Sequence, residues 1–206
     1  MIYGLKMADI KLLGRLYYNQ IKQQSKADIF NLCEQLWQSG YLEEGFIACD
    51  WAWRLKKKYT PDDLKLFKKW INQYVNNWAT CDTFCNHVVG DFVMMYPEYI
   101  TEIKSWTKSK NRWMRRAAAV SLIAPARKGM FLKEMIEIAT ILLTDNEDIV
   151  QKGYGWMLKV ASQTYQQEVF NFVLQHKEVM PRTALRYAIE KMPESTFDEI
   201  ADKYVE

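Results

Sequence analysis

The chain has 206 residues and carries 28 Lys and Arg against 25 Asp and Glu, a formal net charge of +3. This length suits a single domain with a substantial core, which we assign to residues 1–206. So small a net charge excludes no class of partner, and the distribution of charge is more informative. Neither a membrane-spanning apolar run nor a signal peptide is present in the sequence. We therefore expect an intracellular protein that does not contact a membrane.

The four cysteines are too few and too scattered for a disulfide framework. They are Cys33, Cys49, Cys81 and Cys85. We interpret them as free thiols that pack as small hydrophobic side chains. Cys81, Cys85 and His87 lie at a spacing that could ligate a metal on a helix, but no second thiol pair with finger spacing accompanies them. The sequence therefore predicts no metal site, and we expect no cofactor.

Apolar residues recur at helical spacing through the first half of the chain. The pattern predicts helices over residues 8–21, 25–37 and 43–58, with Ser25 as an N-cap and Ser39-Gly40 as a stop. Thr60 is predicted to cap the next helix, with Pro61 in its first turn. That helix continues to Tyr74 and is followed by one over residues 79–95.

The second half also reads as helical. Predicted helices cover residues 97–106, 113–123, 131–143, 149–161, 164–175, 181–191 and 195–205. No run alternates with the period of two that is typical of a strand. The helices come in pairs of roughly 35 to 45 residues, as in HEAT and armadillo repeats. We predict an all-α fold, an α-α superhelix of stacked antiparallel helix pairs whose inner helices line a concave groove.

Trp78 and Asp82 are four residues apart and therefore lie on one face of a helix. The indole attracts a cation through its quadrupole, and the carboxylate attracts it by Coulomb interaction. A second feature is a basic stretch between Lys104 and Lys128 that contains eight Lys and Arg and no acidic residue. Such a stretch is a candidate phosphate-binding surface, for which we expect DNA affinity that falls steeply with salt.

Three motifs together resemble the AlkD-type DNA alkylation repair glycosylases. They are Asn-Asn-Trp-Ala-Thr-Cys-Asp at 76–82, Asn-Arg-Trp-Met-Arg-Arg-Ala-Ala-Ala at 111–119 and Gln-Lys-Gly-Tyr-Gly-Trp-Met-Leu-Lys at 151–159. Their order and spacing agree with the family over roughly residues 36–191. The resemblance implies a HEAT-like enzyme that excises cationic N3- and N7-alkylated purines from duplex DNA, and we expect a monomer. It implies neither a metal nor flipping of the base into a pocket.

The resemblance also assigns roles to individual residues. Trp78 and Trp156 would flank the lesion, Asp82 would be the catalytic carboxylate, and Arg116 would hold the DNA backbone nearby. From the residues themselves we expect Arg112, in the basic stretch, and Lys152 and Lys159, which flank Trp156, to contact phosphates. Lys159 stands where the family more often has arginine. We expect the protein in the cytoplasm, at the nucleoid. The region before residue 36 is short for the family, and weaker clamping of DNA could follow.

The chemistry of alkylated purines supports the same assignment. Alkylation makes the base cationic, so that it leaves as a neutral molecule and needs no general acid. The useful group is a carboxylate that stabilises the oxocarbenium character of the sugar and positions water, and Asp82 suits that role. Gly153 and Gly155 do not follow a strand, so we interpret them as sites of close helix packing or approach to DNA.

Structural interpretations of the same residues remain open at this point. Large aromatics usually pack in cores, Asp82 could be a helix-capping acid, and Arg116 could be a surface ion-pair partner. Two other functions also remain. One is a non-catalytic HEAT-like module that binds damaged or branched DNA, and the other is a solenoid that holds a peptide in its groove.

Overall fold

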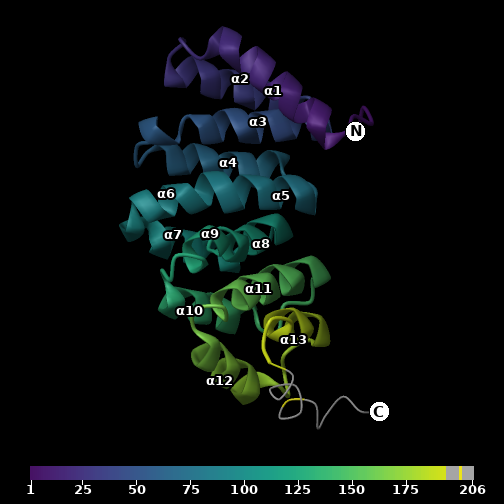
Figure 1. The fold of residues 1–206 in the computed structure, drawn as a ribbon, viewed down its shortest axis with the longest axis vertical. Coiled ribbons are helices and arrows are strands. Elements are labelled where there is room, and N and C mark those ends of the chain that lie inside the picture. The colour runs from purple at the N-terminus through teal and green to yellow at the C-terminus, as the bar shows by residue number, and fades with distance from the viewer. Residues whose placement is uncertain (194–199, 201–206) are drawn as a thin grey trace. The chain divides into compact units, whose positions relative to one another are not determined.

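The computed structural model describes residues 1–193 and residue 200 (Figure 1). Every regular element in these residues is a helix, which confirms the all-α prediction. The chain groups into two compact units, unit 1 (Met1–Met95) and unit 2 (Tyr96–Glu206). No helix among the described residues is long and apolar enough to cross a bilayer. The prediction of one domain over residues 1–206 stays a prediction.

Unit 1 consists of six α-helices and two short segments of other helix types. The α-helices are α1 (Met7–Ile21), α2 (Lys26–Gln38), α3 (Leu42–Arg54), α4 (Asp63–Tyr74), α5 (Trp78–Phe84) and α6 (Gly90–Met95). A 3-10 helix, η1 (Lys56–Lys58), follows α3, and a π-helical segment, η2 (Cys85–Val89), joins α5 to α6. The predicted helix over 79–95 is therefore confirmed, with a wider turn inside it.

Local capping explains where several of these helices begin and end. The Ser25 hydroxyl accepts a hydrogen bond from the Asp28 N–H and starts α2 as predicted. Gly40, with φ of 73°, ends the turn between α2 and α3. These helices pack against each other across a short loop, as in an αα-hairpin (Figure 1).

The predicted start of α4 is wrong by two to three residues. Helix α4 begins at Asp63 with Asp62 in the N-cap position, and the Thr60 hydroxyl instead accepts a hydrogen bond from Lys26 Nζ at 3.2 Å. The Asp63 carboxylate instead accepts the Thr60 N–H at 2.7 Å and forms an ion pair with Lys26. A contact from a distant helix thus decides a boundary that local sequence assigned to Thr60.

The core of unit 1 is aromatic. Phe67, Trp70, Phe84 and Phe92 are fully buried and meet mostly edge to face, with ring centroids 5.7 to 6.1 Å apart. Such contacts add directional stability to the area that these rings remove from water. They hold α4, α5 and α6 together and so fix the helix that carries Trp78 and Asp82.

Unit 2 has seven α-helices within its described residues. They are α7 (Ile100–Ser105), α8 (Arg112–Val120), α9 (Ile123–Ala126), α10 (Leu132–Leu142), α11 (Asp148–Ala161), α12 (Gln166–His176) and α13 (Arg182–Ile189), with 3-10 helices η3 (Pro97–Tyr99) and η4 (Trp106–Lys108). Helix α11 is central, because it packs against α8, α9, α10, α12 and α13. The helix predicted over 195–205 lies outside the described residues, apart from Ile200.

Small residues allow α11 to approach its neighbours closely. A Cβ on Gly155 would lie 2.8 Å from both the Ala184 carbonyl oxygen and the Tyr187 Cβ of α13. Ala117, Ala118 and Ala119 of α8 are fully buried. The prediction that Gly155 serves close helix packing is confirmed. This close packing sets the separation of α11, which carries Trp156, from α13.

Candidate functional site

The first part of the candidate site is the start of α5. Asn77 has an extended backbone, and its side-chain oxygen accepts the Thr80 N–H at 2.9 Å, so α5 begins directly after it. Thr80, Cys81 and Phe84 form the buried face of this helix. Trp78 therefore lies in the first turn, and the predicted i, i+4 relation to Asp82 is retained.

Trp78 and Asp82 belong to the outward side of α5. Trp78 is 65% exposed, more than any other tryptophan of the chain, whereas Asp82 is half-buried. Four of the eight tryptophans, Trp37, Trp51, Trp70 and Trp106, are buried as core residues. An indole this exposed contributes little to the core, so packing alone does not explain Trp78.

The second part of the candidate site lies on α8 and α11 of unit 2. Asn111 caps α8 by accepting the Trp113 N–H at 2.9 Å, and Arg112 and Arg116 follow one turn apart. Helix α11 carries Lys152, Trp156 and Lys159, and it packs directly against α8. Trp156 is half-buried. Unit 2 thus brings together the five predicted site residues that its sequence contains.

Arg116 is placed differently from a surface side chain. It is only 6% exposed, and its Nη1 donates a hydrogen bond to the Ile149 carbonyl oxygen at the start of α11. A Cβ on Gly153 would lie 3.2 Å from the Arg116 Cγ and 3.3 Å from its Nη1. Gly153 therefore makes room for the arginine, and the interpretation of Arg116 as a surface ion-pair residue is wrong.

The other predicted DNA-contacting cations form ion pairs with nearby acids. Arg112 pairs with Glu147 at 3.3 Å, Lys152 with Asp148 at 2.6 Å, and Lys159 with Glu190 at 2.9 Å. The hydrogen bond to Asp148 raises the pKa of Lys152 above its usual value. A phosphate that bound here would either displace these carboxylates or share the three cations with them.

The basic stretch between Lys104 and Lys128 divides into two groups. Lys104 pairs with Glu137, and Arg115 with Asp145, each at 2.6 Å. Four others are exposed and make no ion pair within residues 1–193, namely Lys108, Lys110, Arg127 and Lys128. The sequence showed the excess of positive charge but not the acids, which lie 30 to 35 residues further along the chain.

The cysteines are confirmed as free and buried. Burial raises the pKa of the Cys33 thiol and raises that of Cys49 well above its usual value. Both side chains are therefore protonated thiols rather than thiolate nucleophiles. Within the described residues, no group of three or more His, Cys, Asp and Glu could hold a metal ion. The absence of a metal requirement stays a prediction.

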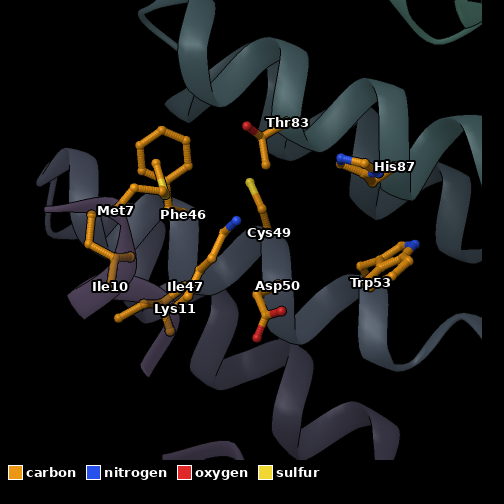
Figure 2. Close-up of a pocket in the computed structure, with 10 residues that line it drawn as sticks. All are labelled: Met7, Ile10, Lys11, Phe46, Ile47, Cys49, Asp50, Trp53, Thr83 and His87. Atoms are coloured by element: carbon orange, nitrogen blue, oxygen red, sulfur yellow. The ribbon is translucent and has the colours of Figure 1, made fainter. Parts of the chain in front are cut away.

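Sequence reasoning missed a pocket in unit 1 that is lined by Lys11, Trp53 and His87, among others (Figure 2). One signal was present. Ala48, Trp51 and Leu55 mark the apolar face of the helix predicted over residues 43–58, so Trp53, two residues after Trp51, faces outward. An outward tryptophan indicates a surface with a function or a partner.

Comparison with known proteins adds the family. The model of the family described as "DNA alkylation repair enzyme" matches residues 1–192. The chain belongs to this family. A search of curated proteins found no match. Membership supports a role in alkylation repair and DNA as the substrate.

Two solved structures resemble this protein over most of its length. One is a predicted DNA alkylation repair enzyme from Enterococcus faecalis, with a TM-score of 0.83, 20% identity, and coverage of 93% of this chain and 88% of that one. The other is smu.31 from Streptococcus mutans UA159, with a TM-score of 0.67, 19% identity, and coverage of 90% and 94% respectively. At these identities the likeness shows the fold of the repair family.

Proposed function

We propose that this member of the alkylation repair family is a DNA N-glycosylase for cationic N3- and N7-alkylated purines in duplex DNA. The observation that carries the proposal is Trp78, 65% exposed at the capped start of α5, with Asp82 one turn away. Family membership supports alkylated DNA as the substrate. The order of the three motifs supports roles for Trp156 and Arg116 of unit 2 in the same reaction.

The chemistry needs little more than these groups. A positively charged purine leaves as a neutral base, so no residue has to protonate it. Positive charge then develops on the deoxyribose, where the Asp82 carboxylate stabilises it and orients the attacking water. An indole stacked on the cationic ring contributes about 1 to 2 kcal/mol when desolvated, and a neutral base gains less. Selectivity for the alkylated base follows without flipping it into a pocket.

Burial of the thiols favours this reaction over direct transfer of the alkyl group to cysteine. A thiol that accepts an alkyl group reacts as its thiolate, at an accessible position. Cys33 and Cys49 are buried and their pKa values are raised, and Cys81 and Cys85 are also inaccessible. Hydrolysis of the glycosidic bond would use Asp82 and Trp78 of α5 instead and needs no thiolate.

We further propose that the protein acts as a monomeric HEAT-like enzyme on cytoplasmic, nucleoid-associated DNA. Arg116 would act through its position beneath α11, and Arg112, Lys152 and Lys159 would exchange acid partners for phosphates. No metal or cofactor enters the reaction as written.

Release of free base from methylated DNA tests the proposal. Duplex DNA treated with a methylating agent is incubated with excess protein, and 7-methylguanine and 3-methyladenine are quantified by chromatography. We expect release above the spontaneous rate, and none of the normal bases from untreated DNA. Binding of the duplex without release would reject the glycosylase and leave a non-catalytic DNA-binding module. Binding of neither DNA would favour the peptide-binding solenoid.

A further inference from the structure

A pocket of about 400 Å³ lies within unit 1 among α1, α3, α5 and η2 (Figure 2). Its apolar walls come from Met7, Ile10, Phe46 and Ile47. Figure 2 shows the Lys11 amine directed toward Cys49 and Thr83, with the rings of Trp53 and His87 further along the same pocket. The pocket therefore combines apolar walls, three aromatic rings (Phe46, Trp53 and His87), one cation and one acid, Asp50.

The aromatic end of the pocket is held in place. The Trp53 indole N–H donates to Asp91 at 2.9 Å, and the Lys56 ammonium lies 4.4 Å from the ring centroid while pairing with the same carboxylate. The His87 ring lies 5.7 Å from that of Trp53. Because these contacts fix the indole, its remaining surface is available to a planar ligand at low entropic cost.

The other end of the pocket is cationic. It continues into a shallower groove that shares Lys11 and Asp50 and adds Arg15 and Arg54. Three cations therefore face one acid, and Asp50 pairs with Arg54 at 2.6 Å. The side chains of Lys11 and Arg15 are exposed, and they form no ion pair or hydrogen bond within residues 1–193. The groove thus attracts an anion next to an apolar, aromatic chamber.

The helix that forms one wall of this pocket also carries the proposed reaction site. Thr83 follows Asp82 directly in α5, and His87 lies in η2, where the wider π-helical turn keeps it on the same side as Thr83. Asp82 and His87 are separated along the helix by about 7 Å, roughly two base-pair steps of DNA. A strand bound at Asp82 could therefore place a nearby nucleotide at the pocket.

We propose that this pocket binds an unpaired nucleotide of the DNA. The base enters the chamber between Phe46 and the Trp53 and His87 rings, and its phosphate contacts Lys11 and Arg15. An unpaired base has both faces free for stacking, whereas a paired base does not reach the pocket. The inference rests on the proposed function in that DNA is the ligand. It concerns a nucleotide other than the lesion, and it involves no bond cleavage.

Binding of unmethylated DNA that contains 2-aminopurine tests the pocket. One duplex carries the fluorescent base paired, the second carries it as a single unpaired nucleotide, and a third sample is free 2-aminopurine deoxyribonucleoside monophosphate. We expect the unpaired duplex to bind about tenfold more tightly than the paired one, as expected for stacking of one base on aromatic rings. Its fluorescence should be quenched on binding, since the base stacks on Trp53.

Variants on α1 give a matched comparison. Lys11→Met should reduce the preference for the unpaired duplex at least about threefold, because it removes one phosphate contact. Lys22→Met, at the exposed C-terminal end of α1, removes the same charge outside the pocket and should leave the preference unchanged. His87→Ala, at another exposed position of the pocket, should lower both the preference and the quenching.

Three outcomes would overturn the inference. Equal affinity of wild-type protein for the two duplexes would do so, as would equal losses in Lys11→Met and Lys22→Met. Free nucleotide that binds as tightly as the unpaired duplex would make the pocket a small-molecule site. Because no excision is measured, a protein that releases methylated bases but shows no such preference retains the proposed function and loses only the pocket.

Discussion

The two parts of the candidate site differ in what their side chains contact before DNA binds. On α5 of unit 1, Trp78 presents most of its indole to solvent next to Asp82. On α8 and α11 of unit 2, Arg112, Lys152 and Lys159 already pair with acids, and Arg116 is buried against Gly153. The Trp78 indole of unit 1 is open to solvent, whereas Arg112, Lys152 and Lys159 of unit 2 would exchange a carboxylate for a phosphate.

This difference separates two tasks within the proposed glycosylase. In that proposal unit 1 would supply the carboxylate and one indole from a single helix, and unit 2 would supply the second indole, Trp156. Unit 2 supplies positioning, and its ion pairs reduce the net charge that a phosphate meets. Strong general affinity for DNA is therefore not expected from these cations, so discrimination between damaged and normal bases depends less on non-specific binding.

Removal of the Asp82 charge should have the largest effect on activity. Asp82→Asn keeps the shape of the side chain but stabilises no positive charge on the sugar. We expect the rate of 7-methylguanine release under single-turnover conditions to fall about 100- to 1000-fold, or about 3 to 4 kcal/mol. Asp9→Asn, which removes an exposed charge from α1, is the matched control and should retain the wild-type rate. An unimpaired Asp82→Asn variant would contradict the assignment of catalysis to unit 1.

Substitution by alanine should lower the free energy of unfolding more at Gly155 than at Gly153, the two glycines of α11. In Gly155→Ala the new Cβ meets the backbone of Ala184 at 2.8 Å, and backbone cannot yield as a side chain does. We expect a net loss of about 1 to 2 kcal/mol, after allowing for the better helix propensity of alanine. Thermal unfolding should show this as a lower Tm.

Gly153→Ala is the matched partner of that variant, since its new Cβ meets the flexible Arg116 side chain. Its stability should stay within about 1 kcal/mol of wild type, because helix propensity offsets the crowding. DNA binding should weaken, however, because Arg116 is displaced. A Gly153→Ala protein with unaltered affinity for DNA would argue against a positioning role for Arg116.

Freeing a cation of unit 2 should strengthen DNA binding slightly. Glu190→Gln removes the partner of Lys159, whose side chain is 18% exposed. We expect affinity for duplex DNA to rise about two- to fourfold at low salt, the scale of one exposed ion pair. The salt dependence should also steepen, because one more cation becomes available to phosphate.

Glu98→Gln is the control for net charge, since Glu98 is exposed and makes no ion pair within the described part of unit 2. If both variants raise affinity equally, the effect comes from net charge and not from release of Lys159. Lower affinity in Glu190→Gln alone would mean that the ion pair itself orients Lys159 toward the DNA.

The sequence predicted those features that depend on neighbours in the chain. Helical periodicity located the helices, and the i, i+4 spacing of Trp78 and Asp82 fixed their shared face. It did not predict η2, because buried residues in a five-residue π-helical segment follow an apolar pattern much like that of an α-helix. The burial of Arg116 and the Lys159–Glu190 pair depend on residues more than 30 positions away, which no local pattern encodes.

The smallest expected effect is on stability in acid, and it comes from the Glu43 carboxylate of unit 1. In unit 1, Glu43 Oε1 accepts the backbone N–H groups of Tyr3, Gly4 and Leu5 at 2.8 to 3.3 Å. Burial alone would raise the pKa of Glu43, but these donors outweigh it and the pKa is lowered. Because the folded pKa lies below that of the unfolded chain, the stabilisation is present above about pH 4.3 and is lost as the pH falls through the folded value.

Urea unfolding between about pH 5 and pH 3 measures this contribution. Glu43→Gln should be less stable than wild type near neutral pH, and its stability should depend less on pH in the acid range. Added salt should change this difference little, since the donors are neutral N–H groups, whereas the ion pairs of unit 2 are screened. A Glu43→Gln protein with the pH dependence of the Asp9→Asn control would show that Glu43 does not hold residues 3–5 against α3.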